Sequence, residues 1–181
     1  MPELTPPTAR VHVSFLAAME ELRAEGRGGS GDATMVGREI QEYTSRWSGP
    51  EGFRDYAAWL RGQALEESPR TAGMVRSTTL WWVSGAEYLG RISIRHQLTP
   101  WLRDYGGHIG YDIRPSARRR GHATAMLAAA LPVAGALGID PVLITCNEDN
   151  VGSRKVIEAN DGVLEDKRGV KLRYWVPASG K

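Results

Sequence analysis

The stretch from residue 107 to residue 124 constrains the fold of this chain more than any other. Residues 108–113 have the composition of a short strand, and 118–121 read Arg-Arg-Arg-Gly, which predicts a tight turn. Small residues from Ala123 onward then open a helix. A turn of this kind leaves backbone N–H groups unpaired at a helix N-terminus, where the helix dipole also favours an anion. The sequence therefore predicts a pyrophosphate-binding site at this turn.

The composition is that of one soluble globular domain. The chain has 181 residues, of which 41% are hydrophobic and 24% are charged. A chain of this length can bury a sizeable core. The net charge of +2 argues against general binding to nucleic acid or to a membrane surface.

Cysteine usage and the lack of targeting signals limit the function further. Cys146 is the single cysteine, which excludes an intramolecular disulfide. No Cys/His cluster has zinc-site spacing, so we expect no metal. The N-terminal residues show no basic region followed by an apolar run, and no stretch reaches the ~18 apolar residues of a membrane helix. We expect a cytoplasmic protein.

Hydrophobic periodicity and turn residues divide the chain into helices and strands. In the first predicted helix, which Thr8 can cap, four apolar residues recur on one face: Val11, Phe15, Met19 and Leu22. The glycine-rich residues 26–31 predict a flexible connector. The predicted helices are 6–25, 53–65, 123–137 and 151–159, and the predicted strands are 77–83, 88–95, 108–113, 141–146, 163–165 and 171–176.

The order of these elements, α-α-β-β-β-α-β-α-β-β, predicts the fold class. Strands and helices that alternate in this way build an α/β (α+β) fold, with a mixed central sheet of about six to seven strands and helices on both faces. Trp81 and Trp82 are adjacent on one strand and should therefore face opposite sides of that sheet.

Two motifs and the order of elements together resemble a known family. Residues 118–123 fit the pattern Arg/Gln-x-x-Gly-x-Gly/Ala, and Asn150 with Ser153 fits Asn-x-x-Ala/Ser after the strand 141–146. The chain resembles the GNAT N-acetyltransferase superfamily over nearly its whole length, and the segments 107–111 and 173–175 are similar to a mostly uncharacterised bacterial branch. The resemblance implies the GNAT fold in a single domain, 1–181, with a helical acceptor-side region at 1–70 and an acyl-CoA-binding part at 77–181.

The resemblance also implies where acetyl-CoA binds. The strands 108–113 and 141–146, the fourth and fifth of the family, should splay apart so that pantetheine pairs with an exposed edge. Backbone N–H groups of 119–124 would hold the pyrophosphate, since Gly121 and Ala123 permit close approach. The implied cofactor-binding residues are Tyr111, Asp112, Ile113, Arg118, Arg119, Arg120, Gly121, His122, Ala123, Thr124, Asn147, Asn150 and Ser153.

Acetyl transfer needs a neutral amine, because an alkylammonium with a pKa near ~10 cannot attack a thioester. Where many relatives have a glutamate base, this chain has His108, whose unperturbed pKa of ~6.5 suits a base near neutrality. Asp112, on the same strand face, and His96 are the alternative bases. The residues expected to contact the acceptor are Arg95, His96, Trp82 and His108.

The general acid departs from the family pattern. Many relatives have a tyrosine seven residues after the asparagine, and here that position holds Ile157. The candidate acids are Ser153, by analogy with ribosomal-protein acetyltransferases, and Tyr174. A thiolate whose thiol pKa is about 8.5 can also leave unaided.

Each of these residues also has a purely structural interpretation. The three arginines of the turn could be a solvated basic surface, and His108 could be a structural histidine. Asn150 could be a helix cap, and Cys146 a buried strand residue. His122, at the variable position of the turn motif, should point to solvent.

The expected function is acetyl-CoA-dependent N-acetylation of a primary amine by direct attack within a ternary complex. The near-neutral charge favours a small-molecule acceptor over nucleic acid. The alternatives are a non-catalytic acyl-CoA-binding module, an acetyltransferase acting on a protein or peptide amine, and a nucleic-acid-binding protein that uses the three arginines. A monomer and a homodimer are both compatible with the sequence.

Overall fold

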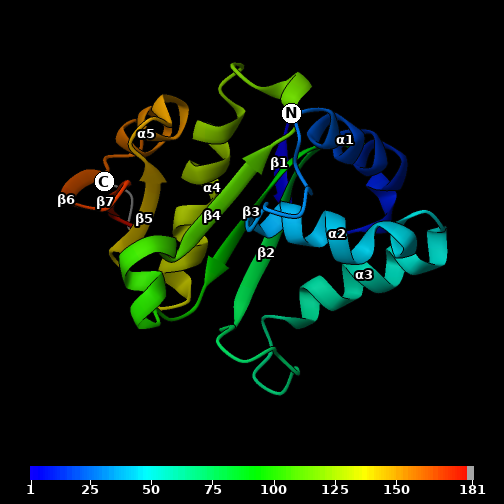
Figure 1. The fold of residues 1–181 in the computed structure, drawn as a ribbon, viewed down its shortest axis with the longest axis horizontal. Helices are drawn as coiled ribbons and strands as arrows, with labels where there is room; N and C mark the ends of the chain where they lie inside the picture. Colours follow the sequence, from blue (N-terminus) through cyan, green and yellow to red (C-terminus); the bar gives the residue numbers. More distant parts are fainter. Residues whose placement is uncertain (179–181) are drawn as a thin grey trace.

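A seven-stranded mixed sheet forms the centre of the molecule, in the order β1-β2-β3-β4-β5-β7-β6 (Figure 1). The structure is a computed structural model and describes residues 1–178, so the last three residues of the predicted domain lie outside it. Neighbouring strands are antiparallel except for the parallel pair β4 and β5. The strands are β1 Glu3–Thr5, β2 Ser77–Ser84, β3 Glu87–Arg95, β4 Ile109–Ile113, β5 Val142–Asn147, β6 Val163–Arg168 and β7 Lys171–Val176.

Helices cover both faces of this sheet, which confirms the predicted fold class. Figure 1 shows α1, α2 and α3 gathered on one side of the sheet, while α4 runs behind it. The helices are α1 His12–Ala24, α2 Met35–Trp47, α3 Pro50–Gly62, α4 His122–Ala136 and α5 Val151–Glu158, and the short helical segments are η1 Ala9–Val11, η2 Leu102–Gly106 and η3 Pro115–Ala117.

Helix α2 was not predicted, because a charged residue occupies one of its buried positions. Thr34 caps the helix by accepting a hydrogen bond from Gly37 N, and Val36 and Ile40 are buried as an amphipathic pattern requires. Glu39 is also buried, since its carboxylate pairs with Arg91 of β3. Three helices, and not the two that the sequence predicts, therefore cover this face of the sheet.

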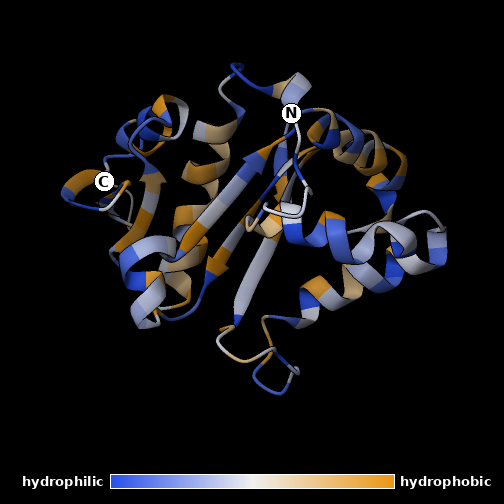
Figure 2. Cartoon of the chain, viewed as in Figure 1, coloured by the Kyte–Doolittle hydropathy of each residue, from blue (hydrophilic) through white to orange (hydrophobic). Residues whose placement is uncertain are grey.

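The sheet has a separate hydrophobic core on each face. Trp81 lies in the aromatic core under α1–α3, together with Phe15, and Trp82 lies in the aliphatic core under α4 and α5. The two tryptophans face opposite sides, as predicted. Figure 2 shows hydrophilic and hydrophobic residues alternating along α2 and α3, the pattern of helices with one buried face. The predicted apolar face of the first helix, from Val11 to Leu22, is buried in the aromatic core.

Strands β4 and β5 separate after a single pairing, Ile109 with Ile144. Gly107 permits the approach before this point: its φ is +64°, and a Cβ there would stand 2.6 Å from the carbonyl oxygen of Leu143. That positive φ and close contact favour glycine. Beyond Ile109 the facing edges of β4 and β5 no longer pair with each other, which is the predicted splay.

Candidate functional site

A cleft of about 560 Å³ opens where β4 and β5 separate. It lies between the end of β4, the turn before α4 and the N-terminus of α5, with the connector after α1 closing one side. The lining residues are Glu25, Arg27, Tyr111, Asp112, Ile113, Ala117, Arg118, Arg119, Gly121, His122, Ala123, Thr124, Asn150, Gly152, Ser153 and Val156. Most of the predicted cofactor-binding residues are in this set.

The turn before α4 has the backbone of an anion-binding loop. Arg119 and Gly121 both have positive φ, 59° and 78°, and Gly121 is the N-cap residue of α4. The N–H groups in the first turn of a helix have no partner within the helix. No atom stands within 4 Å of the point where a Gly121 Cβ would lie, so a ligand can approach the backbone closely. The turn therefore offers N–H donors at the positive end of the helix dipole.

Two hydroxyl groups meet across the cleft. Tyr111 OH and Ser153 Oγ are 2.7 Å apart, within hydrogen-bonding distance. Burial raises the pKa of Tyr111 to about 12, although the hydrogen bond with Ser153 acts in the opposite direction. Ser153 N donates to Asn150 Oδ1, so Asn150 caps α5 and also lines the cleft. The cap interpretation of Asn150 is thus confirmed.

The glycine-rich connector after α1 forms part of the cleft, which the sequence analysis missed. Arg27 Nη2 lies 3.3 Å from Asp112 Oδ1 on β4, and Arg27 Nε lies 3.1 Å from Asp32 Oδ2. Burial raises the pKa of Asp112, and the charge of Arg27 partly opposes this. Glu25 pairs with Arg118 of the turn at 2.8 Å. The only signal in the sequence was a set of charged residues around a run of glycines.

The family model for the acetyltransferase (GNAT) domain matches residues 32–163. The chain belongs to the GNAT acetyltransferase family. No curated protein matches the chain by sequence. Enzymes of this family take the acetyl group from acetyl-CoA, and the predicted fold, donor and class of reaction are thereby confirmed.

Solved GNAT structures share the fold at low sequence identity. Mycobacterium smegmatis RimJ, solved with CoA-disulfide, is 18% identical with a TM-score of 0.66, over 98% of this chain and 82% of RimJ. The microcin C7 self-immunity acetyltransferase MccE, solved with acetyl-CoA and AMP, is 12% identical with a TM-score of 0.62, over 97% of this chain and 92% of MccE. The PaiA N-acetyltransferase of Thermoplasma acidophilum, solved with coenzyme A, is 12% identical with a TM-score of 0.59, over 98% of this chain and 99% of PaiA. These likenesses support the fold.

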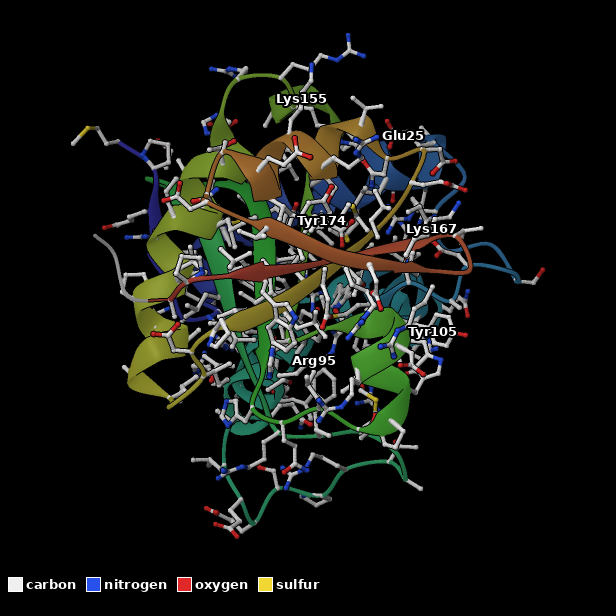
Figure 3. The ribbon with its side chains drawn as sticks, turned by 90° about the vertical axis from the view of Figure 1, so that its left-hand side faces the viewer. Glu25, Arg95, Tyr105, Lys155, Lys167 and Tyr174 are labelled. Atoms are coloured by element: carbon white, nitrogen blue, oxygen red, sulfur yellow. The ribbon has the colours of Figure 1, made fainter. Side chains whose placement is uncertain are left out.

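Several predicted site residues of the acetyltransferase lie outside the cleft lining. Arg120 and Asn147 are exposed. Tyr174 OH donates to Glu158 Oε1 at 3.1 Å within the α5 side of the sheet, and Figure 3 shows Tyr174 on the opposite side of β7 from Arg95. Trp82 Nε1 donates to His122 Nδ1 at 3.3 Å, on the face of the sheet opposite α1, α2 and α3. The positions of Tyr174 and Trp82 do not fit an acid or an acceptor contact.

His108 is held in a form that does not suit a general base. Leu143 N donates to His108 Nδ1 at 2.9 Å, so the neutral ring carries its proton on Nε2 and has no free lone pair. Burial, together with the charges of Arg103 and Arg95, lowers the pKa of His108 to about 4. His108 also does not line the cleft. These features favour a structural role at the start of β4.

The acetyltransferase should lose stability in mild acid because of His108. Its pKa falls from 6.5 in the unfolded chain to about 4 in the fold. Between these values the unfolded chain binds more protons, so the free energy of unfolding should rise with pH over this window and level off above it. His108→Asn keeps an acceptor for Leu143 N but cannot titrate. Denaturant unfolding at several pH values should show a shallower slope in this variant, and an equal slope would contradict the assignment.

The other two predicted acceptor residues lie at the end of β3. Arg95 Nη1 donates to the carbonyl oxygens of Gly106 and Gly107 at 3.0 and 3.1 Å. His96 Nε2 lies 2.8 Å from Thr78 Oγ1, and burial with the charge of Arg76 lowers its pKa. His96 therefore packs against the neighbouring strand, whereas Arg95 faces β4.

Within residues 1–178 no helix has both the length and the apolar character needed to cross a membrane. In the same described part of the chain, no group of three or more His, Cys, Asp or Glu side chains is arranged to hold a metal ion.

Proposed function

We propose that this acetyltransferase modifies the primary amine of a small molecule, by direct attack of the amine while both substrates are bound. The observation that carries the proposal is the cleft of about 560 Å³ whose base is the N–H-rich turn and whose side is the gap between β4 and β5. Its volume is within the range of sites that bind a small molecule or a cofactor, which supports binding of the donor. A nucleic-acid substrate is not favoured, because the net charge is only +2.

The proposed binding mode assigns each part of the cleft to one part of the donor. The N–H groups of 119–124 bind the pyrophosphate, and the edge of β4 at Tyr111–Ile113 pairs with pantetheine. Arg118 and Arg119 line the same end of the cleft and add positive charge for the phosphates. Acetyl-CoA supplies an activated thioester, and the chain has to orient it. The amine nitrogen gives up one proton before attack and a second one after it, and the departing thiolate takes up one proton.

Ser153 is the proposed donor of a proton to the departing thiolate, with Tyr111 positioning it. Their hydroxyl groups are 2.7 Å apart, and both residues line the cleft. Because burial raises the pKa of Tyr111 to about 12, the phenol keeps its proton at neutral pH and can donate it to Ser153 Oγ. The hydroxyl of Ser153 is then free to donate into the cleft.

Asp112 is the proposed base that takes the proton of the attacking ammonium. Unlike His108, it lines the cleft, and its strand face points toward the helices of the acceptor side, where Arg91 and Arg27 also lie. Burial raises its pKa, which makes the carboxylate a stronger base than one in water. The ion pair with Arg27 at 3.3 Å holds the carboxylate at the cleft.

The two proton-transfer assignments predict different pH profiles. Ser153→Ala should lower kcat about tenfold to a hundredfold, with little change in the affinity for acetyl-CoA. Asp112→Asn should lower kcat/KM by about a hundredfold and remove the acid limb of its pH profile. Thiol release measured from pH 5 to pH 9 tests both, with Thr145→Ala as a matched control outside the cleft lining. An unchanged acid limb in Asp112→Asn would exclude Asp112 as the base.

The proposed function is tested by thermal unfolding with and without acetyl-CoA, followed by a panel of primary amines assayed for free thiol. Ligand at a hundredfold above Kd adds about 2.7 kcal/mol, which corresponds to a rise of roughly 5–10 °C for a chain of this size. Stabilisation without thiol release for any amine would favour the non-catalytic module. The absence of both would refute the proposal.

A protein or peptide amine is the second candidate acceptor. Tyr105 of η2 and Trp101, which directly precedes η2, are exposed, with 43% and 60% of their surface accessible. Their rings are 6.2 Å apart. Exposed aromatic side chains are typical of surfaces that bind other proteins or peptides. Adding N-terminal peptides to the amine panel distinguishes the two acceptors, because a peptide enzyme should prefer them to free amines.

A further inference from the structure

Arg95 is a mostly enclosed cation without a carboxylate partner. Its guanidinium donates from Nη1 to the carbonyl oxygens of Gly106 and Gly107. No carboxylate oxygen of residues 1–178 lies within 4.0 Å of it. Burial lowers its pKa, and no neighbouring charge restores it. The two carbonyl groups accept hydrogen bonds from the Arg95 guanidinium, but they are neutral and do not balance its positive charge.

The buried arginines of this fold, unlike Arg95, each pair with a carboxylate. Arg91 pairs with Glu39, Arg114 pairs with Glu21, and Arg173 pairs with both Glu165 and Asp166. Buried charges are costly unless they are paired. Arg95 is half-buried and has no such partner, which leaves its charge available to a counter-ion from a ligand.

The guanidinium of Arg95 packs over Gly110 of β4, where glycine leaves room for it. The two terminal nitrogens, Nη2 and Nη1, are 3.6 and 3.8 Å from the point where a Gly110 Cβ would stand, and no other atom lies within 4 Å of that point. The hydrogen bonds of Arg95 in the described structure use Nη1, which leaves Nη2 free for a ligand. Gly110 is partly exposed.

This position is next to the proposed reaction site. Gly110 directly follows Ile109, the last residue of β4 that pairs with β5, so it stands where the gap between the strands begins. Figure 3 labels Arg95 and Tyr105 on the same side of β5, near the η2 helix. Neither Arg95 nor Gly110 lines the cleft itself, whose lining on β4 begins at Tyr111. A group bound by Arg95 would therefore lie just beyond the inner end of the cleft.

We propose that Arg95 binds a carboxylate of the acceptor, so that the substrate class is amines that carry a carboxylate, such as free amino acids. This inference rests on the proposed function, since it names the acceptor of that same site. The guanidinium fork matches a carboxylate, and one positive charge balances one negative charge. A phosphate-bearing or uncharged amine is the competing outcome.

The test compares amines in matched pairs, each free amino acid with its carboxamide, in the wild type, Arg95→Gln and Arg95→Lys. Wild type should prefer the carboxylate members. Arg95→Gln should lower kcat/KM about tenfold to a hundredfold for them and far less for the amides. Arg95→Lys keeps the charge without the fork and should retain part of the preference.

Comparing acids with amides in each variant distinguishes carboxylate binding by Arg95 from a purely structural role of Arg95. Arg95 also holds two carbonyl groups before β4, so a purely structural role would lower turnover equally for acids and amides, which would overturn the proposal. Wild type that is stabilised by acetyl-CoA but acetylates no carboxylate-bearing amine would also overturn it, and the proposed acetyl transfer could still stand on other amines. Wild type that neither gains stability with acetyl-CoA nor releases thiol would instead refute the proposed function.

Discussion

Gly121→Glu should abolish the stabilisation of this protein by acetyl-CoA. The glycine caps α4 with a φ of +78° and presents an open backbone to the cleft. A glutamate there would place a side chain and a negative charge where we propose that the phosphates bind. Like charges brought together cost several kcal/mol, and about 2.7 kcal/mol already corresponds to a hundredfold loss of affinity. We expect a loss of at least about a hundredfold by calorimetry, and no thermal shift.

The matched control is Gly121→Ala, which adds the same backbone strain without charge. A non-glycine residue at positive φ costs on the order of 1 kcal/mol, so both variants should unfold earlier than the wild type in the absence of ligand. The alanine variant should still gain stability with acetyl-CoA. If the glutamate variant binds acetyl-CoA as tightly as the alanine variant, the phosphates do not bind at this turn.

Glu39→Leu should lower the free energy of unfolding by about 3–5 kcal/mol, because it leaves a buried arginine without its partner. Arg91 has 1% of its side chain exposed, and its Nη2 lies 2.9 Å from Glu39 Oε1. Tyr56 also donates its hydroxyl to this carboxylate. For a chain of this length the melting temperature should fall by roughly 6–20 °C.

The control for this loss is the double variant Arg91→Met with Glu39→Leu. Removing both charges leaves no unpaired ion, and replacing a buried pair by apolar groups is often neutral or stabilising. The double variant should therefore be more stable than Glu39→Leu alone in urea unfolding. If both variants lose the same stability, packing of α2 on β3 and not the ion pair accounts for the effect.

Much of the fold could be predicted from local patterns. The strand-forming composition of β2 and β3, the glycine turn and the continuous apolar run of β5 each depend on neighbouring residues alone. Helix α2 and strand β1 could not be predicted in this way. Glu39 breaks the apolar pattern of α2 because its partner Arg91 lies on a strand 52 residues away, and Glu3–Thr5 is too short to show a period.

The cofactor end of the site was easier to predict than the acceptor end. The turn at 118–123 and Asn150 belong to local motifs, so the sequence shows them, and both line the cleft in which we propose that acetyl-CoA binds. The role of His108 depends on a hydrogen bond from Leu143, 35 residues away, and on two nearby arginines. Arg27 reaches Asp112 across 85 residues. Contacts of this kind are set by the fold and leave no pattern in the chain.

The place of β7 has a consequence for synthesis of the chain. This strand lies between β5 and β6 in the sheet, although it follows both in sequence. During translation the edge of β5 therefore emerges about 25 residues before the strand that covers it, and an uncovered apolar edge can pair with other chains. Nascent chains stalled before residue 171 should need chaperone protection that the finished protein does not.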